Sequence, residues 1–322
     1  MTNALVLAGA LIACNKPEPE PATIVAPAQK RPVIKDTSFR FPAPERIVAI
    51  GDLHGDLSAT RAALRLAGVI DSEDRWAGGT TVAVQTGDQL DRGDDEPQIL
   101  QLLERLSAEA KAAGGALHAL NGNHEVMNAQ GDFRYVTEDG FRDYHQAPLE
   151  SAHSHAVQRL PPVQRGRAAA FLSGGTVAAR LAARPVVIQV GVNVFVHGGL
   201  LEQHVDYGLG RINREVEQWM RAPALSPAPA VVANEQGPIW LRLYSEGIPL
   251  ASACAELTRV LERLSAKRLI VGHTVQQQGI NSACQGKVWR IDVGLSRYYG
   301  ERPPAVLEIK GDEARVLRGG GG

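Results

Sequence analysis

Short apolar runs alternate with longer amphipathic stretches in the first half of the chain. Apolar runs at residues 47–50, 80–86 and 116–120 predict buried strands. The stretch after the second run carries one apolar stripe at helical spacing, formed by Ile99, Leu102, Leu103, Leu106 and Ala110. A helix is also expected after the first run, with Ser58 as its cap. Strands alternating with helices predict a largely parallel sheet and an α/β fold.

The second half of the chain predicts hairpins as well as helices. Residues 186–190 and 192–196 form two apolar runs that turn at Gly191, and residues 268–271 predict another strand. Helices are expected at 211–221 and 251–264, and strands at 288–293, 305–310 and 313–317. These late hairpins predict a second, mixed sheet packed on the first. Residues 126–184 show a poorer pattern, which indicates a helical cap with loops.

Polar side chains with metal-binding groups follow five of the predicted strands. They are Asp52, His54, Asp88, Asn123, His197 and His273. Because ligand-binding groups in open α/β sheets lie outside the carboxyl ends of the strands, we expect these six to meet at one rim. Taken alone, Asp52 and His54 also fit ordinary turn chemistry. The recurrence of such residues at five strand ends favours a metal site.

This combination of ligands indicates a class of metal ions and the chemistry they support. Carboxylate, amide and imidazole groups suit divalent Mn, Fe, Zn or Ni better than an ion that prefers thiolates. Six ligands are too many for one ion and fit two ions that share a bridging carboxylate. Two metals about 3.5–4 Å apart stabilise both the attacking and the leaving oxygen of a phosphoryl group. The pattern therefore predicts phosphoester hydrolysis.

Composition and charge exclude one class of partner. The 322-residue chain is 44% hydrophobic and has a formal net charge of −1, with its Lys and Arg residues scattered. An electrostatic nucleic-acid interface requires clustered positive charge, so no nucleic-acid partner is expected.

The N-terminal segment predicts export. Residues 4–13 are apolar but too short to span a bilayer, and the sequence Leu11-Ile12-Ala13-Cys14 resembles a bacterial lipobox. We expect a signal peptide at 1–13 and a Pro/Ala-rich linker at 14–44. The protein would attach to the membrane only through a lipid on Cys14 and would face the periplasm or cell exterior. A buried helix or a frayed tail is the alternative.

An exported chain also permits a disulfide between Cys254 and Cys284, whereas a reducing cytosol would leave two thiols.

Five ordered motifs carry a family resemblance. The segments Gly51-Asp52-x-His54-Gly55, Gly87-Asp88-x-x-Asp91-Arg92-Gly93, Gly122-Asn123-His124-Glu125, His197-Gly198-Gly199 and Gly272-His273 resemble those of calcineurin-like metallophosphoesterases, most of all the bacterial Shewanella-like protein phosphatases. The resemblance runs from about Glu45 to Leu317. It implies an αββα sandwich of two mixed β-sheets flanked by helices, with the catalytic domain at 45–318.

The resemblance also implies a role for each residue. Asp52 and His54 would bind the first metal, Asp88 would bridge both, and Asn123, His197 and His273 would complete the second. His124 would protonate the leaving oxygen, with Asp91 orienting and charging its imidazole. Arg92 would bind the phosphate as a planar fork. Arg242, in the segment Gly237-Pro238-Ile239-Trp240-Leu241-Arg242, matches the second phosphate arginine of the Shewanella-like group.

The resemblance implies a phosphatase with two divalent ions, manganese first among them. Hydrolysis would proceed by direct attack of a metal-bound hydroxide without a phosphoenzyme. The expected substrate is a phosphorylated protein or peptide, and phosphotyrosine, phosphoserine and phosphothreonine all remain open. A small phosphoester, such as a nucleotide or dinucleoside polyphosphate, is the alternative substrate. A metal-binding module without activity is the alternative from another class.

Overall fold

The computed structural model describes residue 1 and residues 37–147, 154–222 and 226–320. The chain divides into two units, Met1–Pro32 and Val33–Gly322, and every element below belongs to the second. The predicted signal peptide and all of the predicted linker before residue 37 lie outside the described residues, apart from Met1. In the part of the chain that is described, no helix has both the length and the apolar character needed to cross a membrane.

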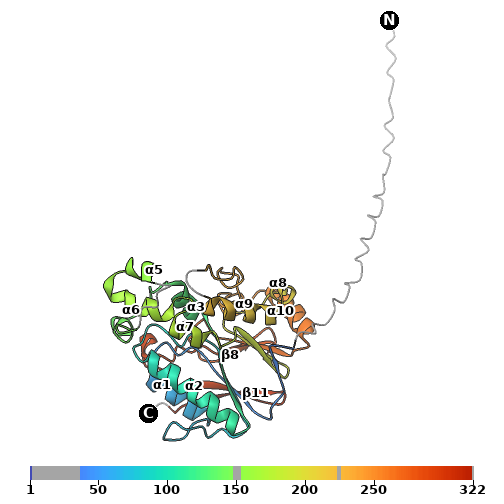
Figure 1. The fold of residues 1–322 in the computed structure, drawn as a ribbon. Coiled ribbons are helices and arrows are strands. Elements are labelled where there is room, and N and C mark those ends of the chain that lie inside the picture. The colour runs from blue at the N-terminus through green and yellow to red at the C-terminus, as the bar shows by residue number, and fades with distance from the viewer. Residues whose placement is uncertain (2–36, 148–153, 223–225, 321–322) are drawn as a thin grey trace. The chain divides into compact units, whose positions relative to one another are not determined.

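Two mixed sheets form the centre of the second unit (Figure 1). The five-stranded sheet has the order β11 (Glu313–Arg318), β10 (Ala305–Lys310), β2 (Ile47–Ile50), β3 (Val82–Gln85) and β4 (Ala116–Ala119). The six-stranded sheet has the order β1 (Arg40–Phe41), β5 (Val187–Val190), β6 (Asn193–Val196), β7 (Arg268–Val271), β9 (Val288–Arg290) and β8 (Asn281–Ala283). Strands β2, β3 and β4 are mutually parallel, and so are β6 and β7.

Apolar side chains fill the space between the sheets and cover their outer faces. Ile188, Phe195 and Ile270 of the six-stranded sheet share a core with strands of the five-stranded sheet and with α1 (Leu57–Leu66) and α2 (Glu96–Ala112). A second core packs the other face of the six-stranded sheet against helices that include α9 (Leu209–Arg221) and α10 (Ala251–Leu264). Figure 1 shows α1 and α2 on one side of the sheets and α9 and α10 on the other. The predicted αββα sandwich is confirmed.

The described residues within 126–184 form mainly helices. The segment contains most of α3 (Asn123–Gln130), followed by α4 (Glu138–Arg142), α5 (Ser154–Gln158), α6 (Pro162–Phe171) and α7 (Thr176–Leu181). The short helix α8 (Glu202–Tyr207) follows β6, and a 3-10 turn, η1 (Arg297–Tyr299), precedes β10.

Some local expectations were wrong or incomplete. The cap of α1 is Asp56, whose carboxylate accepts a hydrogen bond from the Ala59 amide at 3.0 Å, and not Ser58. The hairpin β10–β11 joins the first sheet beside β2, because β10 is buried along most of its length and fits between two strands. Strands β1 and β8 were not predicted, since two or three residues carry too little pattern to detect.

Cys254 of α10 and Cys284, which follows β8, form a disulfide. The pairing considered from the sequence is therefore confirmed. The bond joins the helical layer directly to the edge of the six-stranded sheet.

Candidate functional site

The six proposed metal ligands lie at the carboxyl ends of strands from both sheets. Asp52 and His54 follow β2, Asp88 follows β3, and Asn123 begins the helix after β4. On the other sheet, His197 directly follows β6 and His273 follows β7. All six are buried, and the most exposed of them, His273, is 8% exposed. The structure therefore brings together groups that lie up to 221 positions apart in the sequence.

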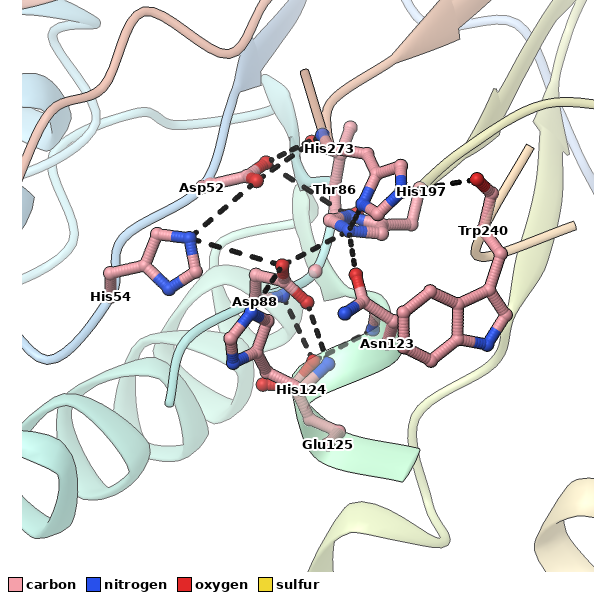
Figure 2. Close-up of polar contacts among 12 residues, drawn as sticks. Asp52, His54, Thr86, Asp88, Asn123, His124, Glu125, His197, Trp240 and His273 are labelled. Carbon is pink, nitrogen blue, oxygen red and sulfur yellow. Dashed lines mark hydrogen bonds and ion pairs between the residues drawn. The ribbon is translucent and has the colours of Figure 1, made fainter. Parts of the chain in front are cut away.

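The carboxylate of Asp88 lies at the centre of this cluster (Figure 2). Its Oδ2 atom is 3.1 Å from His197 Nε2, 3.7 Å from His124 Nε2 and 3.9 Å from His54 Nε2. Asp52 Oδ2 is also 3.9 Å from His54 Nε2. Figure 2 shows Asp88 between the imidazole of His54 on one side and those of His197 and His273 on the other. This placement is the one that a bridging ligand requires.

A second group of donor atoms converges more tightly. His197 Nε2 lies 3.0 Å from Asn123 Oδ1 and 3.1 Å from His273 Nδ1, in addition to Asp88 Oδ2. Among the described residues, two clusters can hold a cation by donor distance: His54, Asp88 and His124, and Asp88, His197 and His273. Asp52 belongs to neither cluster. Its two oxygens accept from the His273 amide at 3.2 Å, and its Oδ2 atom lies 3.9 Å from His54 Nε2.

Main-chain carbonyls fix the orientation of the imidazole rings. His54 Nδ1 lies 3.0 Å from Leu90 O, and His197 Nδ1 lies 2.9 Å from Thr86 O. His273 Nε2 lies 3.1 Å from Trp240 O. When such a ring is neutral and one nitrogen donates to a carbonyl, the other nitrogen has the lone pair that a metal needs, which is the usual arrangement at metal-binding histidines. In each of these rings, the nitrogen that does not contact a carbonyl lies toward the cluster.

This donor set fits two divalent ions. Asp52, His54 and Asp88 would hold one, and Asp88, Asn123, His197 and His273 would hold the other. The oxygen and imidazole donors suit first-row divalent metals. When bound, such ions act as Lewis acids on phosphoryl oxygens and lower the pKa of water.

The pKa values of these groups are shifted in both directions. Burial and the charge of Asp292 raise the pKa of Asp52 well above its ordinary value. Burial opposes the charge of Asp88, but the imidazoles of His197 and His124 keep its pKa well below the usual value. Burial lowers the pKa values of His54 and His273 well below the usual range. For His197, burial is outweighed by Asp88 and Asp52, which raise its pKa to about 9. Below that pH, binding of a cation to His197 Nε2 would therefore release a proton.

Backbone strain is concentrated at the same loops. His54, Asp88, Asp91, Arg92 and His273 all have φ values between +44° and +67°. Residues other than glycine rarely adopt positive φ values. Those that do are held there by the surrounding structure and often lie at functional sites. Gly122 and Gly272 are required for a related reason, because a Cβ atom at either would collide with the carboxylate of Asp88 or Asp52.

His124 and Asp91 form a buried pair beside the cluster. His124 Nδ1 lies 2.5 Å from Asp91 Oδ2, which leaves Nε2 facing Asp88. Burial lowers the pKa of His124, but the charge of Asp88 and the contact with Asp91 outweigh it and raise the pKa above its ordinary value. The pair therefore holds a proton on a nitrogen that faces the metal cluster, as proton transfer requires.

The two proposed phosphate arginines lie at different depths. Arg92 Nη1 donates to His54 Nε2 at 2.8 Å and to the Tyr299 hydroxyl. One lone pair cannot serve both Arg92 and a cation, so metal binding at His54 requires the guanidinium to move. Arg242 is exposed and donates through Nη1 to His273 O and Thr274 Oγ1, both at 2.8 Å. It is therefore joined to the cluster through the main chain of His273.

Several supporting residues were missed from the sequence or given no role. Glu125 lies in a recognised motif, and its carboxylate accepts from the amides of Asp88, Gln89 and Gly122 at 2.7–2.9 Å. Asp292 is a buried carboxyl whose pKa is raised by burial to about 6.

Two further groups of residues surround Arg92 and the Asp91 carboxylate. Three tyrosine rings, Tyr135, Tyr298 and Tyr299, surround the Arg92 guanidinium at 5.1–5.5 Å. A buried network around Asp91, formed by Glu96, Asn128 and Arg167, has no motif that could have revealed it.

We expect the substitution Asp88→Asn to weaken metal binding strongly. The amide keeps the shape of the side chain but removes the negative charge that both clusters share. Loss of a group that merely orients a ligand costs about 10–100-fold in affinity, so loss of this shared ligand should cost more than about 100-fold. Isothermal titration with Mn²⁺ measures the change. The control is Asp94→Asn, because Asp94 lies in the same loop but is exposed and hydrogen-bonded to Thr137. This variant should bind Mn²⁺ as the wild type does. Equal isotherms for all three proteins would contradict the assignment of Asp88 as a shared ligand.

Asp91→Asn should lower the pKa of His124. The substitution removes the negative partner that stabilises the imidazolium, so the ring should deprotonate at a lower pH than in the wild type. Titration of isotopically labelled histidine followed by NMR, after chelation of divalent ions, measures the shift. Asp132→Asn, which removes only an ion pair with the exposed Arg134, is the matched control. An unchanged His124 titration in Asp91→Asn would show that the pair is not electrostatically coupled.

Comparisons with known proteins agree with the geometry. Residues 45–277 match the family model described as calcineurin-like phosphoesterase. A Shewanella-like protein phosphatase 2 of Arabidopsis thaliana is 43% identical over 301 residues, covering 85% of this chain and 77% of that protein. A Shewanella-like protein phosphatase 1 of Plasmodium berghei is 29% identical, covering 85% and 74%. The crystal structure of a cold-active protein-tyrosine phosphatase from a psychrophilic Shewanella species shares the fold, with a TM-score of 0.67 and 22% identity over 87% of this chain and 82% of that one. This chain therefore belongs to the calcineurin-like phosphoesterase family, in its Shewanella-like branch, and is a metal-dependent phosphatase.

Proposed function

We propose that this phosphatase removes phosphate from phosphorylated proteins or peptides with the help of two divalent ions, manganese by preference. The observation that carries the proposal is the His124–Asp91 pair beside the shared carboxylate of Asp88. A module that only bound metal would need the ligands but not a buried proton donor. The names of the relatives from Arabidopsis and Plasmodium support a protein substrate.

Each residue has a proposed task in the reaction. Asp52, His54, Asp88, Asn123, His197 and His273 hold the metals. Arg92 and Arg242 bind phosphate oxygens, and the planar guanidinium can donate two parallel hydrogen bonds to them. As the bond from water oxygen to phosphorus forms and the ester bond breaks, His124 Nε2 gives its proton to the leaving oxygen. The products are hydrogen phosphate and the free hydroxyl, and the proton that the attacking water gives up restores the imidazolium of His124.

The surroundings of Arg92 favour an aromatic phosphoester. Tyr135 and Tyr298 are 40% and 59% exposed, and both rings lie against the Arg92 guanidinium. Exposed rings beside a phosphate-binding group can stack on the ring of a phosphotyrosine side chain. The Shewanella protein that shares the fold is named a protein-tyrosine phosphatase, which points to the same substrate.

We also propose that the protein is exported and anchored by a lipid on Cys14. The lipobox-like sequence Leu11-Ile12-Ala13-Cys14 supports this location, although it lies outside the described residues. The disulfide between Cys254 and Cys284 is independent support, because such bonds persist mainly in oxidising compartments.

With Mn²⁺ present, we expect the kcat/KM for a phosphotyrosyl peptide to exceed that for the matched phosphoseryl and phosphothreonyl peptides at least about tenfold. This ratio corresponds to a difference of about 1.4 kcal/mol in transition-state stabilisation. Diadenosine tetraphosphate should be a poorer substrate than all three. The Asp88→Asn protein controls for contaminating phosphatases. A preference for diadenosine tetraphosphate would establish the small-molecule alternative, and failure to hydrolyse any of them with Mn²⁺ would favour a metal-binding module.

Replacing Cys14 with Ser should release the protein from the membrane fraction of an expressing bacterium, because the side chain that carries the lipid is lost. Fractionation followed by immunoblotting measures the distribution. Cys254→Ser removes a different cysteine and should leave the protein in the membrane fraction. Retention of Cys14→Ser in the membrane would rule out the anchor.

A further inference from the structure

The helix α6 supplies a buried arginine to the site. The Arg167 side chain is fully buried, with an exposed fraction of 0%. Its guanidinium lies 4.4 Å from the centre of the Phe171 ring and 5.6 Å from that of Tyr144. A buried guanidinium is costly unless its donors are paired, so its partners indicate why it is there.

Every N–H group of Arg167 has an acceptor. Nε donates to Asn128 Oδ1 at 2.8 Å, and Nη1 donates to Glu96 Oε2 at 2.6 Å and to Gly140 O at 2.9 Å. Nη2 donates to Glu96 Oε1 at 3.0 Å and to Asp91 Oδ1 at 3.3 Å. These contacts use all five donors of the guanidinium. Lysine, with three donors and no planar fork, cannot reproduce the set.

The contact with Asn128 fixes which way its amide points. Because the Nε–H of arginine can only donate, the atom of Asn128 that faces it must be Oδ1. The amide nitrogen is therefore directed to Asp91 Oδ1, at 3.0 Å, and to the carbonyl of His124, at 2.9 Å. Arg167 thus acts on Asp91 through Asn128 as well as directly.

Glu96 connects Arg167 to the main chain of Asp91. Its Oε1 atom accepts from the Asp91 amide at 2.6 Å while pairing with Arg167. Asp91 has a φ of +67°, a strained conformation that the surrounding contacts must hold. The positive charge of Arg167 is balanced by Glu96, so the charge of Asp91 remains available to His124.

We propose that Arg167, with Glu96 and Asn128, is the positioning unit that holds the Asp91 carboxylate in line with His124. These residues are not expected to touch the substrate. They occupy Asp91 Oδ1, so that Oδ2 alone faces His124 Nδ1. The inference rests on the proposed function, in which His124 gives a proton to the leaving oxygen.

Arg167→Lys tests the inference when two aryl phosphates are compared with Mn²⁺ present. Phenyl phosphate releases a basic phenolate that needs a proton, whereas 2,4-dinitrophenyl phosphate releases an anion that needs none. We expect kcat for phenyl phosphate to fall about 10–100-fold, the range for residues that orient a catalytic group, and kcat for the dinitrophenyl ester to fall by less than about threefold. Elemental analysis should show the metal content of the wild type.

A matched control lies in the same helix. Arg165 bonds to the carbonyls of Leu160 and Gln158, both at 3.0 Å, and neither of these residues belongs to the site. Arg165→Lys should leave both rates unchanged. If Arg167→Lys does not fold, as shown by its thermal melt, Asn128→Ala removes an uncharged member of the unit and should show the same selective loss.

The outcomes separate the two proposals. An equal loss on both esters, or no loss, overturns the positioning role and leaves the proposed function intact. Failure of the wild-type protein to hydrolyse either ester overturns the proposed function and the inference together. Selective loss on phenyl phosphate in Arg167→Lys, with Arg165→Lys unaffected, supports both.

Discussion

The site depends on one buried carboxylate, that of Asp88, which three imidazole nitrogens approach within 4 Å. His54 follows β2 and His124 lies in the first turn of α3, after β4, so both come from the five-stranded sheet, whereas His197 follows β6 of the six-stranded sheet. Neither sheet alone provides all six proposed ligands. The packing of the two sheets, with their parallel strand ends at a common rim, is therefore a condition for function as well as for stability.

Concentrating charge in the interior requires support from the surrounding structure. The loop that carries Asp88 is held by Glu125, whose carboxylate accepts hydrogen bonds from three main-chain amides. The neighbouring turn that carries Asp91 is held by Arg167 from the helical segment that follows α3. These carboxylates and the guanidinium are buried and hydrogen-bonded, as buried polar groups must be. The strained backbone at the ligand loops is compatible with a stable fold because these contacts restrain it.

The sequence was sufficient for the strand-end residues and the sandwich. Polar residues that follow short apolar runs have a regular position in the sequence, and the rule that strand ends share a rim brings them together. Arg167 could not be found this way, because it lies in a poorly patterned helix 76 positions from Asp91, and a surface arginine looks the same in a sequence. The two-residue strand β1 depends on tertiary contacts, which a single sequence does not reveal. The cap formed by Asp56 is a local contact with the Ala59 amide, and the sequence offered both Asp56 and Ser58 for that position.

Anomalous diffraction from crystals grown with manganese tests the central claim most directly. The account predicts two peaks about 3.5–4 Å apart, with Asp88 between them, Asp52 and His54 on one, and Asn123, His197 and His273 on the other. Peaks located away from these residues, or a single ion that Asp88 does not touch, would contradict it.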